Sequence, residues 1–462
     1  MAIQPAGRRT VACRAVRRFA RRAGLAVFLL TPVLAMGQAA VTGPVIGYGR
    51  SGTGFFGRGG DVNGAALPEN PMGFERGPMV EIYTEGGGGL PVAKVWRIPL
   101  HFIVGVNAGY DSNPGTGGGG EGSVDEPASG FVGATILVTY QFVGPRFSGS
   151  LSTDAVLNLY SNREDRGEFY QPNAHLSAAL GYAVSQRLSL DSSASISYQS
   201  EPDISLDATV NRQSGNYLVA NGSLGATYVW LPRLSSVTSY NISVTDYAEE
   251  TENAQSRTGN EFTLGFNYSL LPRTSLNGNY DFNWTAYKSD GTSLSQSLLV
   301  GATHQFSLFL NGSLQVGVQF QSTDRDSVGQ TSNASPIFNS SLAYVLGSKT
   351  VLSWTAGYSI EEPDVANASS RETLRTGLNL SHQLTGLISA TASAYYRHDM
   401  NVMSGDTGNS TEDAFDASIG LSYAFRHNMS ATASYQRTQL FSDEPGSSYS
   451  SNRISLGLLV SF

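Results

Sequence analysis

The stretch Ile454-Ser455-Leu456-Gly457-Leu458-Leu459-Val460-Ser461-Phe462 ends the sequence and has a period of two. Every second residue counted back from Phe462 is apolar, and the residues between are Ser or Gly apart from Leu459. This period predicts a β-strand with one apolar and one polar face. Because an aromatic residue ends the strand with no polar tail after it, we expect that end to lie against apolar material.

The same pattern resembles the closing strand of Gram-negative outer-membrane β-barrels, where the assembly machinery reads a terminal Phe and alternating apolar residues. The resemblance implies an assembly signal made of Ile454, Leu456, Leu458, Val460 and Phe462. It also implies outer-membrane lipids and the barrel-assembly machinery as partners. The alternative is the last strand of a soluble β-sandwich, which alternates in the same way.

The composition favours the membrane alternative. Only 14% of the 462 residues are charged, against about 25% in soluble domains. Beyond the N-terminal region, no window approaches the ~18 consecutive apolar residues of a transmembrane helix. Low charge, 52 Gly and frequent Ser, Asn and Tyr are typical of a barrel with an apolar outside and a polar interior.

Residues 1–37 have the features of a signal peptide for Sec export. A basic region is followed by the short apolar run 24–33 and by small residues that suit cleavage. The only cysteine, Cys13, lies in this segment, so disulfide and thiol chemistry are not expected in the mature chain. Seven basic residues leave with the segment, so the mature chain would carry 22 basic and 37 acidic side chains, a net charge of −15. A chain this acidic is not expected to bind nucleic acid.

Three domains are predicted: the signal peptide, a Gly- and Pro-rich flexible periplasmic segment at 38–100, and an outer-membrane barrel at 101–462. A folded plug is the alternative for 38–100. Alternating segments recur through the barrel and predict an all-β, antiparallel, up-and-down barrel of eighteen strands. Sixteen strands would follow if 293–306 and 312–324 rearranged. The predicted strands are 101–111, 129–142, 146–160, 170–184, 187–200, 215–230, 234–247, 259–270, 274–288, 293–306, 312–324, 335–346, 350–361, 370–383, 387–399, 413–425, 429–441 and 452–462.

The connections between these strands are short and long in strict turn. The short ones carry Pro, Gly, Ser or Asn, and the long ones are acidic, as at 121–126, 361–364 and 406–413. Short turns at the periplasmic end and long loops outside are typical of outer-membrane barrels. Aromatic residues near both strand ends predict two interfacial girdles, one with Phe142, Tyr182, Trp230, Phe306, Tyr344, Phe425 and Phe462, the other with Tyr110, Tyr160, Tyr198, Tyr247, Tyr287, Tyr358 and Tyr396.

No constellation indicates an enzyme, a metal site or a cofactor. The six histidines are scattered singly, and neighbouring residues of a strand point to opposite faces. Asp111-Ser112-Asn113 and the loop carboxylates have oxygen atoms that could bind Ca²⁺, but solvated loop tips explain them better. We expect no catalytic, cofactor-binding or metal-binding residues.

The polar strand faces predict a lumen lined mainly by Ser, Thr, Asn and Gln. The charged pore-lining candidates are Asp154, Asp191, Asp281, Arg375, Arg397, Asp416 and Arg437. The three arginines opposite Asp416 would set a transverse field, as constriction charges do in porins. Alternatively, they form paired struts that brace the wall.

The element from Val106 to Pro114, with Gly-x-Asp-Ser-Asn-Pro, resembles an outer-membrane β-barrel porin family often found with exopolysaccharide-export loci. The resemblance spans about residues 100–462 and implies a channel. The leading hypothesis is passive passage of small hydrophilic solutes or oligosaccharides. The alternatives are an accessory barrel for exopolysaccharide export and a structural or adhesive surface barrel with a blocked lumen. The acidic loops predict a cation preference that fades as salt rises.

Overall fold

The computed structural model describes residues 100–114, 128–161, 170–200, 216–248, 255–288, 291–326, 329–363, 368–403, 409–443 and 448–462. All regular elements in these ranges are β-strands. None of these ranges holds a helix long and apolar enough to span a membrane. The predicted signal peptide and, apart from Leu100, the predicted segment 38–100 lie outside the described residues.

The described residues form eighteen strands, as predicted, and the alternative of sixteen is wrong because β10 and β11 are separate strands that pair with each other. The strands are β1 Leu100–Asp111, β2 Ser129–Val143, β3 Phe147–Tyr160, β4 Tyr170–Ala183, β5 Leu188–Gln199, β6 Tyr217–Leu231, β7 Leu234–Tyr247, β8 Arg257–Leu271, β9 Thr274–Tyr287, β10 Thr292–Gln305, β11 Leu310–Arg325, β12 Gly329–Leu346, β13 Thr350–Glu361, β14 Ala368–Gln383, β15 Ile388–Met403, β16 Ser410–Arg426, β17 Met429–Ser442 and β18 Tyr449–Ser461.

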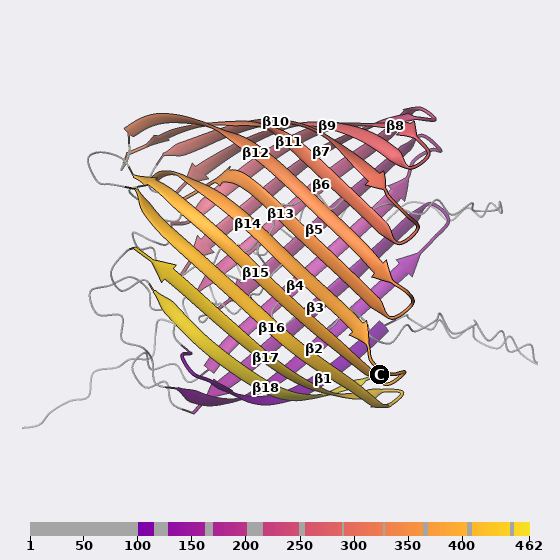
Figure 1. Cartoon of the computed structure of the whole chain (residues 1–462), viewed down its shortest axis with the longest axis vertical. Coiled ribbons are helices and arrows are strands. Elements are labelled where there is room, and N and C mark those ends of the chain that lie inside the picture. The colour runs from indigo at the N-terminus through magenta and orange to yellow at the C-terminus, as the bar shows by residue number, and fades with distance from the viewer. Residues whose placement is uncertain are drawn as a thin grey trace, which may run out of the picture. The chain divides into compact units, whose positions relative to one another are not determined.

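The strands form one closed antiparallel barrel (Figure 1). Each strand pairs with its neighbours in sequence, and β1 also pairs with β18 from Ile103–Ser461 to Asp111–Arg453. Closure gives the first and last strands a partner on both sides, so the sheet has no edge at the seam between them.

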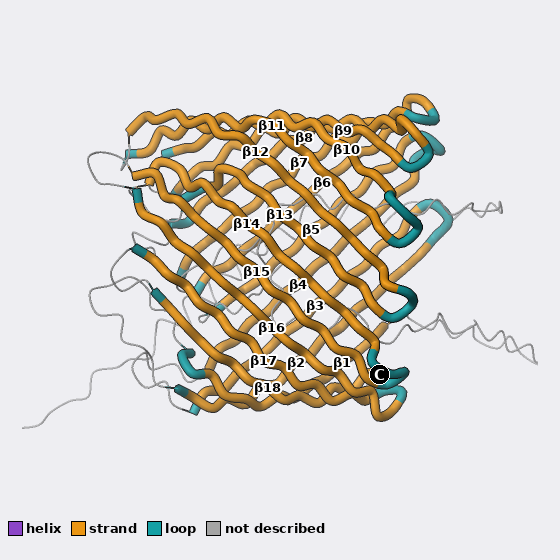
Figure 2. The backbone as a smooth tube through the Cα atoms, in the orientation of Figure 1, coloured by secondary structure: helices purple, strands orange, loops and turns teal. Residues whose placement is uncertain are grey.

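The two ends of the barrel differ. Short turns join β2 to β3, β4 to β5 and so on at one end, which also carries Phe462; we call it the turn end (Figure 2). In three of these turns a hydroxyl oxygen, from Ser185, Ser307 or Thr385, accepts hydrogen bonds from backbone N–H groups two and three residues later. These local bonds favour a tight reversal of the chain. The longer connections lie at the opposite end, the loop end.

Apolar side chains point outward and polar ones inward. Val300 is 59% exposed and Leu456 is 64% exposed on the outer face, whereas Ser295, Gln319 and Asn279 are buried on the inner face. The outer face also carries the apolar residues of the predicted assembly signal. The barrel therefore has a polar interior in place of a hydrophobic core, which agrees with the alternation in the sequence.

The predicted girdle at the loop end is wrong in part. Tyr160, Tyr247 and Tyr287 are almost completely buried and lie on the inward face of their strands. Tyr287 is an even number of residues from Asp281, so the two share the inward face. Tyr110 and Tyr396 do lie on the outer face, exposed as predicted.

The Gly-x-Asp-Ser-Asn-Pro element forms hydrogen bonds that join β1 to β18 at the loop end. Asp111 Oδ1 accepts hydrogen bonds from Asn113 N at 3.1 Å and from Ser451 Oγ at 2.6 Å. Ser112 N donates to Asn452 O, and Asn452 N donates to Ser112 Oγ. The buried Asp111 carboxylate thus has protein donors, and its role here is to hold the closing seam.

Candidate functional site

The barrel wall is interrupted between β12 and β13 on the side of the loop end. β12 pairs with β11 from Gly329 to Tyr344, but it pairs with β13 only from Leu346–Thr350 to Phe338–Tyr358. Residues 329–337 therefore have a strand on one side only within the described chain. Pro336 lies in this segment, and Pro lacks the N–H that a second strand would need as a donor.

Beyond Tyr358 the chain turns into the lumen and crosses the inner face of β12 to reach β11. Residues 359–363 and 368–372 make up this part, which we call the inner hairpin end. Gln319 of β11 bonds both backbone groups of Ile360: Nε2 donates to Ile360 O at 2.8 Å, and Oε1 accepts from Ile360 N at 3.0 Å. A side-chain amide here takes the place of a neighbouring strand, and Ile360 is completely buried.

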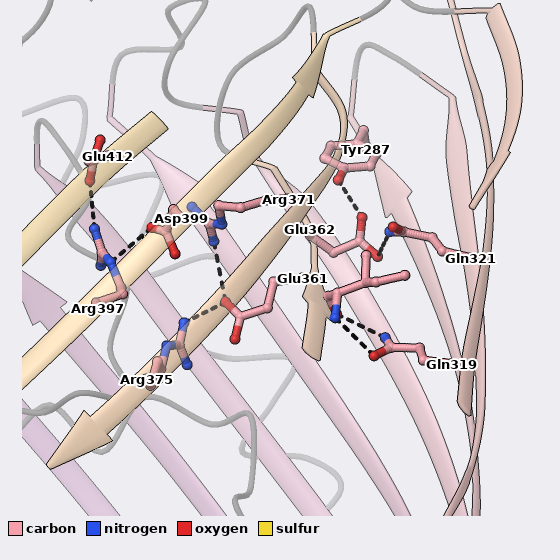
Figure 3. Close-up of polar contacts among 11 residues, drawn as sticks. Tyr287, Gln319, Gln321, Glu361, Glu362, Arg371, Arg375, Arg397, Asp399 and Glu412 are labelled. Carbon is pink, nitrogen blue, oxygen red and sulfur yellow. Dashed lines mark hydrogen bonds and ion pairs between the residues drawn. The ribbon is translucent and has the colours of Figure 1, made fainter. Parts of the chain in front are cut away.

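Further side chains of β9 and β11 hold the inner hairpin end. Glu362 accepts hydrogen bonds from the Tyr287 hydroxyl at 2.7 Å and from Gln321 Nε2 at 3.3 Å (Figure 3). Thr323 Oγ1 donates to Ser369 O, and Arg325 Nη1 donates to Ala368 O, both at 3.2 Å. The guanidinium of Arg325 also lies 4.4 Å from the centre of the Tyr287 ring, a favourable cation–π geometry.

A ladder of six charged side chains continues from the inner hairpin end across β14, β15 and β16. Glu361 Oε2 pairs with Arg371 Nη2 at 3.4 Å and with Arg375 Nη2 at 2.5 Å. Arg397 pairs with Asp399 at 2.8 Å and with Glu412 at 2.6 Å. Figure 3 shows Glu361 between two arginines and Arg397 between two carboxylates. We call Glu361, Arg371, Arg375, Arg397, Asp399 and Glu412 the charge ladder.

The strand register explains the charge ladder. Glu361 is directly opposite Arg371, Arg375 is opposite Arg397, and Asp399 is opposite Glu412. These side chains all point inward, where burial makes an unpaired charge costly. Two of these opposite pairs carry like charges, so most of the ion pairs form diagonally or along one strand: Arg375 pairs with Glu361, and Arg397 pairs with Asp399 and Glu412. Three positive and three negative groups thus lie together on the lumen wall, next to the inner hairpin end. The arrangement can filter solutes by size and charge.

The structure places six of the seven predicted pore-lining residues on the inward face: Asp154, Asp191, Asp281, Arg375, Arg397 and Asp416. Of these, Arg375 and Arg397 come together in the charge ladder. The other four are spread over four strands, and Asp416 accepts a hydrogen bond from Thr438.

Arg437 is a correction. It lies on the same face of β17 as the exposed Tyr435 and Phe441, so it points outward, and it bonds Asn452 Oδ1 at 2.8 Å. The proposed field of three arginines against Asp416 is therefore wrong. The partners of the two inward arginines are Glu361, Asp399 and Glu412.

Four members of the charge ladder were not predicted from the sequence: Glu361, Arg371, Asp399 and Glu412. The sequence interpretation placed Glu361 and Glu412 in acidic loops, although both lie in strands, and it did not consider Arg371 or Asp399. The alternation of strand faces would have identified Arg371 and Asp399, because they are an even number of residues from Arg375 and Arg397 and therefore share their inward face. Nothing in the sequence indicated that Gln319 and Gln321 bind the inner hairpin end.

One protein family and several proteins of known structure are similar to this chain. Residues 104–462 match the model of a family described as "Putative beta-barrel porin 2". Among solved structures, OpdK of Pseudomonas aeruginosa, crystallised with vanillate, is 12% identical with a TM-score of 0.44, over 78% of this chain and 99% of its own. A BenF-like porin from Pseudomonas fluorescens Pf-5 is 10% identical with a TM-score of 0.44, over 78% and 98%. OccAB4 of Acinetobacter baumannii is 9% identical with a TM-score of 0.44, over 79% and 99%. No curated protein matches the chain.

Proposed function

Because the chain belongs to the "Putative beta-barrel porin 2" family, as the sequence around residues 106–114 predicted, we propose that it is an outer-membrane channel for small hydrophilic solutes or oligosaccharides. Solutes would cross passively, and the charge ladder with the inner hairpin end would form the narrow part of the path. The proposal assigns no chemical reaction to the chain.

The closed barrel with an inward polar face is the observation that carries this proposal. Inward Ser, Thr, Asn and Gln side chains can exchange hydrogen bonds with water and with hydroxylated solutes. The outward apolar face suits the hydrocarbon of a bilayer, in which only closed sheets and helices satisfy their backbone groups. Barrels of this strand number are wide enough to hold an aqueous path.

Conductance of the purified mature chain in planar bilayers tests the proposal. We expect discrete current steps in KCl after insertion, from protein that migrates as a heat-modifiable band and has a β-rich circular dichroism spectrum. Heat-denatured protein added at the same concentration is the control. Folded protein that inserts without conducting would favour the alternative of a structural or adhesive barrel with a blocked lumen.

The channel should prefer cations at low salt. Inward carboxylates outnumber inward guanidinium groups in the described strands and the inner hairpin end: Asp111, Asp154, Asp191, Glu261, Asp281, Glu361, Glu362, Asp399, Glu412 and Asp416 against Arg257, Arg325, Arg371, Arg375, Arg397 and Arg453. Exposed charges are screened beyond about 10 Å at 0.1 M salt, so the preference should fade as salt rises. Reversal potentials across KCl gradients measure it, and anion preference at low ionic strength would contradict the prediction.

Export of an exopolysaccharide remains the second candidate, supported by the family resemblance. Uptake of labelled neutral oligosaccharides into liposomes of the mature chain separates the two candidates. Passage of short sugars that falls with chain length fits a diffusion channel, whereas retention of long polymers without passage of short ones fits an export accessory.

A further inference from the structure

We propose that the inner hairpin end, residues 359–363 and 368–372, is a gate that moves between its present place in the lumen and the barrel wall. The proposal deepens the proposed function, since it describes how that channel would be opened. It rests on two features of the described residues: the side-chain nature of the contacts that hold this segment inside, and the one-sided edge of β12 beside it.

The contacts with β9 and β11 can be broken without unpairing any two strands of the barrel. Residues 368 and 370–372 pair with 403 and 400–402 of β15, so that end of β15 would move with the gate. Gln319 bonds the backbone of Ile360, Gln321 and Tyr287 bond Glu362, and Thr323 and Arg325 bond the carbonyl groups of Ser369 and Ala368. Side-chain hydrogen bonds add only about 0.5–1.5 kcal/mol each to stability. A handful of such bonds can therefore be exchanged for others of similar strength.

The edge of β12 offers the alternative place. Residues 329–337 pair with β11 and not with β13, and continuing the register from Phe338–Tyr358 would bring residues 359–363 opposite residues 333–337. Asn333 already donates to Ser370 Oγ at 3.2 Å and to Glu372 Oε1 at 3.1 Å, so the segment is next to this edge. Pro336 has no backbone N–H to donate at this edge. A continuous row of backbone hydrogen bonds therefore cannot hold the segment permanently in the wall. Two positions of similar free energy are what a gate requires.

The charge ladder would move in part with the gate. Arg371 and Glu361 lie on the inner hairpin end, opposite each other, and Arg371 is also opposite Asn401 near the end of β15. Arg397, Asp399 and Glu412 lie on β15 and β16, which pair with each other on the side away from the gate. Arg375, on β14, pairs with Glu361 at the base of the segment. Opening would therefore widen the lumen beside Arg397 and leave its own two ion pairs in place.

The test removes the two amides that hold the gate. Gln319→Leu/Gln321→Leu should shift the gate toward the wall and raise the population of the open state about tenfold, which corresponds to about 1.4 kcal/mol. Gln315→Leu is the matched control, because Gln315 lies on the same face of β11 but bonds Asn277 at 3.0 Å, away from the inner hairpin end. Heat-modifiable migration shows that each variant is folded.

The first readout needs no conductance. Ser335→Cys places a thiol on the inward, buried face of the β12 edge, and the mature chain has no other cysteine. A water-soluble maleimide should label this cysteine about tenfold faster in the double variant than in the wild-type or Gln315→Leu background. A cysteine at Ser341, where β12 is paired with β13, should show no change. Equal labelling rates of the Ser335 cysteine in all backgrounds would overturn the gate, whether or not the protein conducts.

The second readout is the current. In planar bilayers the double variant should spend about ten times longer in its largest conductance level than the Gln315→Leu protein. Faster labelling with unchanged currents would show that the segment moves without controlling flow, which would overturn its role as a gate. A barrel that conducts in no variant would contradict the proposed function, while the labelling result would still decide whether the segment moves.

Discussion

Arg397→Leu should lower the free energy of unfolding by about 3–5 kcal/mol, the usual cost of removing one partner from a buried ion pair. Arg397 is 7% exposed and is the charged partner of both Asp399 and Glu412. Leucine fills part of the space but leaves two carboxylates close together on the inner wall, where like charges repel. Denaturant titration in detergent or lipid, followed by tryptophan fluorescence and heat-modifiable migration, measures the loss.

Two further variants show whether the stranded charges cause the effect. Arg437→Leu makes the same substitution on the outward face, and it should be nearly neutral because its partners Asn452 and Gln439 are uncharged. Arg397→Leu/Asp399→Asn/Glu412→Gln removes the stranded charges and should recover a large part of the loss. If Arg397→Leu and Arg437→Leu were equally stable, the charge ladder would have no structural role.

Much of the barrel could be predicted because alternation and turn chemistry are local. The period of two, the small and polar residues of the turns and the alternation of connection lengths together indicated eighteen strands, and each strand overlaps its predicted range. Which residues point into the barrel and which point outward followed from the alternation of side chains along each strand. Arg437 was predicted to point inward and Tyr287 to lie in an outward girdle, and both predictions were wrong. Counting alternate residues along β17 and β9 would have placed both side chains on the correct face.

The inner hairpin end could not be predicted in this way. Strand β12 was expected to begin at residue 335, whereas it begins at Gly329, and this extension belongs to the part, residues 329–337, that does not pair with β13. The contact of Gln319 with Ile360 joins residues 41 positions apart on strands that are not neighbours. The alternation of polar and apolar residues carries no information about such a contact, because the contact depends on the point at which the chain leaves the barrel wall.

Phe462→Asp should prevent formation of the closed barrel. Phe462 follows β18 at the turn end, where its N–H donates to Phe102 O at 2.7 Å and its carbonyl accepts from Phe102 N at 3.3 Å. Its side chain is 74% exposed and lies on the outward face with Leu458 and Leu456. In the proposed membrane setting, a carboxylate there replaces an aromatic group at the interface with a charge that resists entry into the lipid.

Ser461→Asp is the matched control, because it introduces the same charge one residue earlier on the opposite face of the strand. Ser461 points inward and its hydroxyl lies 3.5 Å from Asn428 O, so a carboxylate there remains in reach of water. We expect the heat-modifiable band in outer-membrane fractions to be lost for Phe462→Asp and retained for Ser461→Asp. Equal loss in both variants would mean that the backbone of the seam is sensitive to any change, and normal levels of Phe462→Asp would contradict an assembly signal on the outward face. Because the two charges differ only in the face they occupy, the comparison isolates what the outward face of β18 contributes to closing the barrel.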